Sequence, residues 1–212
     1  MFSLSSGAPA VARIKPGDSV VLDTADCFSD QLRSPADRPD AVDWQHINPA
    51  TGPVFVEGAE PGDVLSVPIE SVDVADRGVM AVSGDFGVLR DRFEGVAFTM
   101  IPIDGGAASV AGASAQSRVD VRRDLQLANP VVETPDGVAS IASAETLDVA
   151  AEIATRDMAD LLAQRLGLSD GDATMLMSAA GQLQVSQVVD PLKTARYAMP
   201  KEILARFGLD LL

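Results

Sequence analysis

Two aspartates and the single histidine are the residues of this chain best suited to chemistry. Asp26 and Asp30 follow a β-forming run, Ser19–Thr24, and His46 comes from the next loop. Carboxylate and imidazole groups that converge on one divalent ion can activate a water molecule. We therefore expect Asp26 and Asp30 to be metal ligands, with zinc or calcium as the metal, and His46 to contact a bound substrate. The alternative for a lone histidine next to Trp44 is an ordinary loop side chain.

Other nucleophiles fit less well. Cys27 is the only cysteine and lies between Asp26 and Asp30, whose negative charges oppose formation of a thiolate. We expect Cys27 to be a small packed side chain, as free cysteines usually are. The three lysines lie beside turns or at a helix start, which argues against a buried catalytic lysine. A single cysteine also excludes an internal disulfide and a multi-cysteine metal cluster.

The segment from Ile47 to Pro53 reads as a stiff turn that presents polar groups. Pro49 and Gly52 restrict the backbone, because proline fixes φ and glycine adopts conformations that other residues avoid. Asn48 and Thr51 are then candidate catalytic side chains, and Gly52 a candidate substrate-binding position. We expect Asn48 and Thr51 to lie in one cleft with Asp26.

Composition limits the function further. The chain has 212 residues, 47% of them hydrophobic, so it can build a well-packed core. Its net charge of −15 argues against nucleic acid or an anionic membrane as partner, since both attract basic surfaces. The N-terminus does not resemble a signal peptide, and no apolar run is long enough to span a bilayer. We expect a soluble, cytoplasmic protein; a high-salt source is a weaker explanation of the acidity.

The first half reads as strands and turns. Pro-Gly-Asp precedes a β-forming run twice, at residues 16–18 and 61–63, which is either a small internal repeat or plain turn chemistry. Further strands are expected at 54–56, 79–83 and 96–103, and 30–45 is expected to be an exposed loop.

The second half turns helical. Apolar residues at helical spacing predict a helix over 146–166, with Ser143 as its N-cap and Gly167 as its stop. Ser169 opens a second helix to about Ala180. A strand over 183–189 and a short helix from residue 200 follow. The fold class is therefore β-rich α+β: a sandwich or barrel-like antiparallel β half, then a helical pair and a returning strand. Residues 1–111 form the β-rich domain, 112–118 a linker or deletion junction, and 119–212 an α+β region packed on the first as one compact unit.

Two segments of the chain resemble the acetamidase/formamidase family. The first is D-C-F-S-D-Q at 26–31 together with I-N-P-A-T-G-P-V-F-V-E-G-A-E-P-G-D-V-L-S-V at 47–67. The second is G-Q-L-Q-V-S-Q-V-V-D-P at 181–191, followed by R-Y-A-M-P-K at 196–201. The resemblance implies a hydrolase of C–N bonds in short linear amides such as formamide and acetamide. It also implies that Asp26 lies at the active centre, that the partner is a small-molecule amide, and that the protein forms a homo-oligomer.

The chain departs from that family in its middle. Members carry a G-G-N-M-D segment and a later G-D-x-H-A-x-x-G-D-G-E segment, which supply metal-binding and catalytic groups, and both are absent here. An internal deletion near residues 112–118 accounts for this most simply. We therefore expect little or no amidase activity. The alternative function is that of a catalytically impaired family member that binds small molecules or forms oligomers.

Overall fold

The computed structural model describes residues 1–2, 5, 7–92, 94–103 and 113–207. The chain forms two compact units, the first made of residues 1–85 and 89–123 and the second of 86–88 and 124–212. The division falls after Arg123, whereas the sequence indicated a junction at 112–118. Residue 112 lies outside the described residues, and 113–118 form a strand of the first unit. The packing of both halves as one compact unit stays a prediction.

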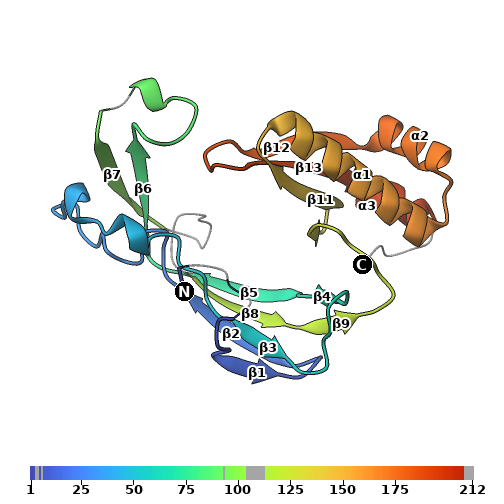
Figure 1. Ribbon diagram of the computed structural model, residues 1–212, viewed down its shortest axis with the longest axis horizontal. Helices are drawn as coiled ribbons and strands as arrows, with labels where there is room; N and C mark the ends of the chain where they lie inside the picture. Colours follow the sequence, from blue (N-terminus) through green and yellow to red (C-terminus); the bar gives the residue numbers. More distant parts are fainter. Residues whose placement is uncertain (3–4, 6, 93, 104–112, 208–212) are drawn as a thin grey trace. The chain divides into compact units, whose positions relative to one another are not determined.

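The strands of the first unit pair in four small sheets (Figure 1). The three-stranded sheet is antiparallel and has β8 (Ala113–Arg118) between β2 (Ser19–Thr24) and β5 (Ile69–Val74). The two-stranded sheets are β1 (Ala12–Ile14) with β3 (Val54–Val56), β4 (Val64–Ser66) with β9 (Asp120–Arg122), and β6 (Arg77–Ser83) with β7 (Val96–Pro102). Only the β1–β3 pair among these is parallel.

The two Pro-Gly-Asp turns have the same geometry. The Asp18 carboxylate accepts a hydrogen bond from the Lys15 N–H at 2.8 Å, and the Asp63 carboxylate accepts one from the Glu60 N–H at 3.0 Å. The glycine between has a positive φ in both turns, 88° and 102°. Glycine adopts that conformation without steric cost, so local turn chemistry fully explains the repeated sequence.

A small hydrophobic core holds the first unit's loops against β6 and β7. Its buried members are Phe28, Leu32, Val42 and Val79, with Ile47, Ala81, Phe98 and Met100 packed against them. Leu32 and Val42 belong to the segment 30–45, which the sequence indicated as an exposed loop. Two short 3-10 turns, Pro39–Ala41 and Trp44–His46, shape this segment. The loop is therefore anchored at both ends of its polar stretch by apolar side chains.

The second unit is a four-stranded antiparallel sheet covered by a long helix. The strand order is β10 (Val131–Glu133), β11 (Gly137–Ala144), β13 (Lys193–Pro200) and β12 (Gln182–Gln187). Helix α1 (Leu147–Leu166) packs on β11 and β13 (Figure 1). The buried Ser140 hydroxyl of β11 donates to the Ala154 carbonyl of α1 at 2.6 Å, which ties the helix to the sheet. Helices α2 (Asp170–Ala180) and α3 (Lys201–Leu204) complete the unit.

The helix ends show which boundary signals were right. Gly167 adopts the left-handed conformation expected of a helix stop, and the Ser169 hydroxyl accepts from the Asp172 N–H to cap α2. The expected N-cap Ser143 is wrong, because that residue lies inside β11. Thr146 caps α1 instead, by accepting from the Val149 N–H at 3.3 Å.

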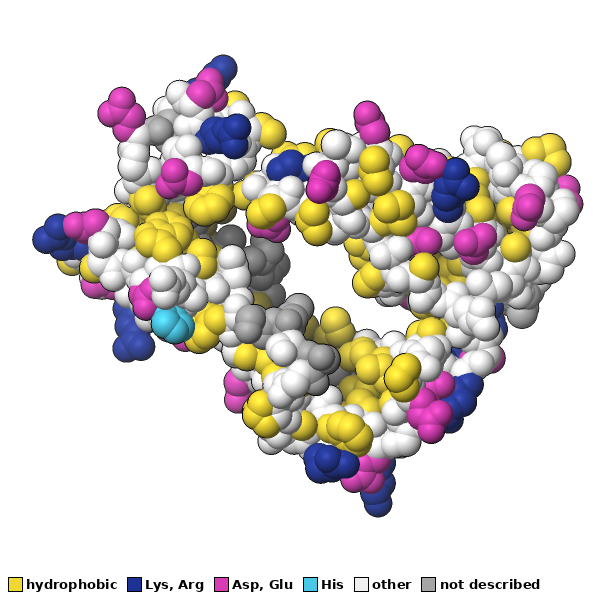
Figure 2. All heavy atoms as spheres, in the orientation of Figure 1, with side chains coloured by type: hydrophobic (Ala, Val, Ile, Leu, Met, Phe, Trp, Pro, Cys, Tyr) yellow, Lys and Arg dark blue, Asp and Glu magenta, His cyan; other side chains and the backbone are white. Residues whose placement is uncertain are grey.

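The β-rich α+β class is confirmed, with more strands in the C-terminal part than the one returning strand expected. On the face drawn in Figure 2, basic side chains stand singly among acidic and apolar ones. Several basic side chains of the described residues pair with carboxylates, such as Arg156 with Glu152 at 2.7 Å. Among the described residues, no helix is both long and apolar enough to cross a membrane.

Candidate functional site

Asp26 organises the turn that follows strand β2. Its Oδ1 accepts hydrogen bonds from the N–H groups of Phe28 at 2.8 Å and Asp30 at 2.9 Å. Ser29 and Asp30 both have positive φ, 55° and 56°, which is unfavourable for residues other than glycine. Asp26 is 8% exposed as a residue, so a largely buried aspartate holds a strained turn in place.

Cys27 differs from its expected role as a packed side chain. The structure places it at the surface, because Phe28 takes the inward position of the turn and fills the core. Partial burial of the sulfur, and then the negative charge of Asp26, raise the pKa of the Cys27 thiol above its usual value. Cys27 is therefore a poor nucleophile at neutral pH; of the two expected acidic neighbours, Asp26 contributes to this shift and Asp30 is not among its causes.

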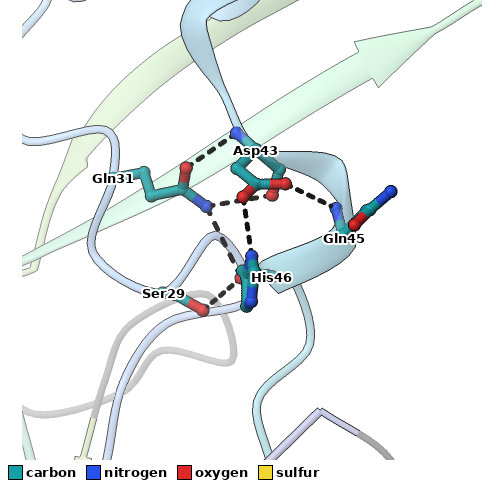
Figure 3. A network of polar contacts seen from close by, with 5 residues as sticks. All are labelled: Ser29, Gln31, Asp43, Gln45 and His46. Atoms are coloured by element: carbon teal, nitrogen blue, oxygen red, sulfur yellow. Dashed lines mark hydrogen bonds and ion pairs between the residues drawn. The ribbon is translucent and has the colours of Figure 1, made fainter.

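A polar network joins this turn to the 3-10 turn Trp44–His46 (Figure 3). The Gln31 side-chain carbonyl accepts a hydrogen bond from the Asp43 N–H. The Ser29 hydroxyl donates to the His46 carbonyl at 2.5 Å. The Asp43 carboxylate contacts His46 Nδ1 at 2.6 Å. The hydrogen bond to His46 lowers the pKa of the Asp43 carboxyl, with help from the Gln45 N–H. The histidine is thus held by a carboxylate, while its own backbone anchors the neighbouring turn.

Asn48 and Thr51 both hydrogen-bond to backbone carbonyls of the Asp26 region. The Asn48 N–H donates to the Cys27 carbonyl at 2.7 Å, and Asn48 has a φ of 52°. The Thr51 hydroxyl donates to the Asp23 carbonyl at the end of β2, at 3.0 Å. Gly52 has a φ of 118° and precedes Pro53. Of the polar side chains singled out from the sequence, the Thr51 hydroxyl therefore binds the backbone near Asp26, whereas Asn48 does so through its backbone N–H.

A cleft of about 580 Å³ opens beside Asp26 in the first unit. Its lining residues come from the end of β2, the following loop, the end of β5, the β5–β6 connection, the start of β6, and β8: Asp23, Thr24, Asp26, Asp30, Leu32, Arg33, Asp73, Val74, Ala75, Asp76, Arg77, Val79 and Ser114. Asp26 and Asp30 are thus brought together here, as the sequence indicated. Asn48, Thr51, Gly52 and His46 are not among the lining residues, so their catalytic and substrate-binding roles stay predictions.

Most of the cleft's charged groups were not identifiable from the sequence. Five aspartates and two arginines line it. Asp23, Ser114 and Asp73 lie opposite one another across β2, β8 and β5. Arg33 is held in the loop by its Nε, which donates to the Asp30 carbonyl at 2.8 Å. The one available signal was the position of Asp23 and Asp73 near strand ends; the register that joins them is not visible in the sequence.

The described residues supply only part of the ligand set that the expected metal would need. Within the described ranges, no three His, Cys, Asp or Glu side chains are grouped so that they could hold a metal ion. A catalytic metal usually has three protein ligands and an open position for water. Asp26 and Asp30 alone do not fit such a centre. Zinc or calcium binding stays a prediction.

Comparison with known proteins gives one consistent family. The profile of the Acetamidase/Formamidase family matches residues 6–121, more than half of the chain. A formamidase of Methylophilus methylotrophus is 33% identical over an alignment of 93 residues, and the match covers 40% of this chain and 23% of that protein. The chain thus matches about a quarter of the length of this curated relative.

Two crystal structures resemble the whole described fold. One is a recombinant predicted acetamidase/formamidase from the thermophile Thermoanaerobacter tengcongensis, with a TM-score of 0.92 and 32% identity over 99% of this chain and 96% of that one. The other is an acetamidase from Bacillus halodurans, with a TM-score of 0.88 and 28% identity over 99% and 97%. Because the profile spans most of the first unit and the thermophile's protein is matched along nearly its full length, this chain belongs to the acetamidase/formamidase family.

Proposed function

We propose that this chain binds short linear amides, such as formamide and acetamide, in the Asp26 cleft and hydrolyses their C–N bond slowly. Family membership supports an amide hydrolase, and the names of the relatives point to these two substrates. The cleft is large enough for molecules of this size.

One observation carries the proposal: the two oxygens of the Asp26 carboxylate have different surroundings. Oδ1 accepts both backbone hydrogen bonds of the turn. In the described part of the chain, Oδ2 accepts none, and the residue lines the cleft. A carboxylate fixed through one oxygen and open at the other is arranged to take a proton from water.

The reaction follows from that arrangement. Asp26 Oδ2 accepts a proton from a water molecule as the water oxygen attacks the amide carbonyl carbon. Arg33 and Arg77 supply the positive charge that stabilises the resulting oxyanion. Asp26 then returns the proton to the leaving nitrogen as the C–N bond breaks, and the products are a carboxylic acid and ammonia. We expect this route to be slow, because a carboxylate is a weaker activator of water than a metal-bound position would be.

A second candidate function is binding without turnover. It is favoured by the absent G-G-N-M-D and G-D-x-H-A-x-x-G-D-G-E segments and by the incomplete set of metal ligands among the described residues. In that case the cleft holds the amide but lacks the groups that speed the attack of water.

Ammonia release from formamide and acetamide by the purified protein tests both functions. The assay is run with a chelator and again with added zinc or calcium. Asp26→Asn keeps an oxygen that can accept the two N–H groups but cannot act as a base, so we expect it to abolish ammonia release. Asp40→Asn is the matched control, because Asp40 is exposed, pairs with Arg38 and lies outside the cleft. Release equal to a protein-free blank, with saturable amide binding by calorimetry, would support binding without turnover.

A further inference from the structure

We propose that Gln31 is a positioning residue: its side-chain amide fixes the strained turn 26–30 against the loop 43–46 and thereby sets Asp26 and Asp30 in the cleft. The effect on catalysis rests on the proposed amide hydrolysis, while the effect on the turn does not.

The Gln31 side-chain amide both accepts from and donates to the backbone of Asp43 (Figure 3). Its Oε1 accepts from the Asp43 N–H at 2.8 Å, and its Nε2 donates to the Asp43 carbonyl at 3.3 Å. A longer contact of 3.5 Å runs from Nε2 to the His46 carbonyl. A primary amide offers one acceptor and two donors, and here all of that capacity is directed at the backbone of the second loop.

Gln31 lies between two residues of the cleft, so its hydrogen bonds to Asp43 affect the cleft directly. Its neighbours Asp30 and Leu32 both line the cleft, and Asp30 is one of the two residues whose N–H is bound by Asp26. Ser29 and Asp30 keep positive φ values that cost energy for residues with a side chain. Such backbone persists only where the surroundings hold it, and the links from Ser29 and Gln31 to the second loop provide that hold.

The link is not required for the fold of the two loops. Phe28 and Leu32 anchor the first loop in the core, and Val42 anchors the second. These apolar contacts remain when the amide is removed. The loss of the Gln31 hydrogen bonds should therefore loosen the turn locally and leave the unit folded.

Three variants test the proposal. Gln31→Leu removes every hydrogen bond at similar volume. Gln31→Glu keeps the acceptor for the Asp43 N–H but loses both donors. Gln45→Leu is the control, because this exposed glutamine belongs to the same network only through its backbone N–H (Figure 3). The readouts are kcat and KM for formamide, the melting temperature, and hydrogen exchange of the amides of residues 26–30.

We expect Gln31→Leu to lower kcat about 10- to 100-fold, as small misplacements of catalytic groups do. KM should change less than about threefold, since binding does not need the base. Gln31→Glu should lie between Gln31→Leu and the wild type, and Gln45→Leu should equal the wild type. Exchange at Phe28 and Asp30 should quicken about tenfold or more in Gln31→Leu, while α1 keeps its protection.

The outcomes that overturn the proposal are distinct from those that overturn the function. If Gln31→Leu exchanges at residues 26–30 as the wild type does, or if it fails to fold, the amide does not position the turn. If the turn loosens but kcat is unchanged, the turn does not limit catalysis and the positioning role is refuted. If the wild type itself releases no ammonia, the proposed function falls, and the exchange measurement alone decides whether Gln31 holds the turn.

Discussion

Asp23 and Asp73 face the same side of one sheet, each directly opposite Ser114. Asp23 of β2 pairs with Ser114 of β8, and Ser114 pairs with Asp73 of β5. Residues directly opposite in an antiparallel sheet point to the same face, and neighbouring strands are about 4.8 Å apart. The backbones of Asp23 and Asp73 are therefore about 10 Å apart, two strand spacings, with Ser114 between them, and all three residues line the cleft.

Ser114→Asp should destabilise the first unit by about 1 kcal/mol, because like charges directly opposite one another on a sheet repel. Ser114→Asn is the control of equal size without the charge. The free energy of unfolding is measured in urea at low salt and at about 1 M salt, where screening extends only about 3 Å. A deficit of Ser114→Asp relative to Ser114→Asn that salt does not reduce would contradict the electrostatic explanation.

Met158→Asp should cost about 4 kcal/mol of unfolding free energy, because it buries an unpaired carboxylate beneath α1. The Met158 side chain is 0% exposed. Met175→Asp in α2 is the matched control, since Met175 is 65% exposed and the same substitution there stays in water. Equal melting temperatures of the two variants would show that the stripe on α1 is not core.

Gly181→Ala should destabilise the second unit by about 2 kcal/mol through overpacking. A methyl group at residue 181 would overlap the ring of Tyr197 and approach the Met177 carbonyl oxygen to 2.7 Å. The Tyr197 hydroxyl donates to that same carbonyl at 2.9 Å, so the ring cannot move without losing its hydrogen bond.

Gly171→Ala provides the opposite case inside helix α2, which ends just before Gly181. The nearest atom to a methyl group there is the Ser169 hydroxyl oxygen at 3.8 Å, which is an ordinary contact. Alanine is the better helix former, so this variant should gain about 0.5 kcal/mol. Urea unfolding of both glycine variants checks the pair, and a loss of stability in Gly171→Ala would be inconsistent with this account.

The pH dependence of Cys27 alkylation should report a thiol pKa above the usual value of cysteine. The charge of Asp26 favours the protonated thiol, so Asp26→Asn should lower this pKa and quicken alkylation at mildly alkaline pH. The shift should be partial, because burial of the sulfur is the larger cause and remains. Asp30→Asn is the control, since Asp30 is not among the causes of the shift. The rate of alkylation by iodoacetamide as a function of pH gives the pKa of the Cys27 thiol in the wild type and in each variant.

Turns and helices were predictable because their signals are local. The Pro-Gly-Asp turns, the Gly167 stop and the Ser169 cap each depend on a few adjacent residues, and the structure shows all of them. The Ser143 cap failed because a strand, β11, continues through that residue. This strand reads G-V-A-S-I-A-S-A, and its small side chains give no clear alternation from which a strand could be predicted.

The sequence predicted only those residues of the candidate site that lie close together in the chain. Asp26 and Asp30 follow a recognisable strand and do share a cleft. Asp73 and Ser114 reach that cleft through the pairing of β2, β8 and β5, which are far apart in the chain. Arg77 is the first residue of β6, just after the β5–β6 connection. Pairing between distant strands depends on the whole fold, so no short pattern could have revealed these three residues.

The central position of β8 also governs the order in which the first unit can assemble. Strands β2 and β5 each pair with β8 and not with each other, although β8 is the last of the three to leave the ribosome. Closing so long a loop costs entropy before any of its contacts form, so high contact order should make this sheet slow to fold. Until β8 emerges, the nascent chain carries two unpaired β-forming segments, which is the stage at which this protein would most need protection from aggregation.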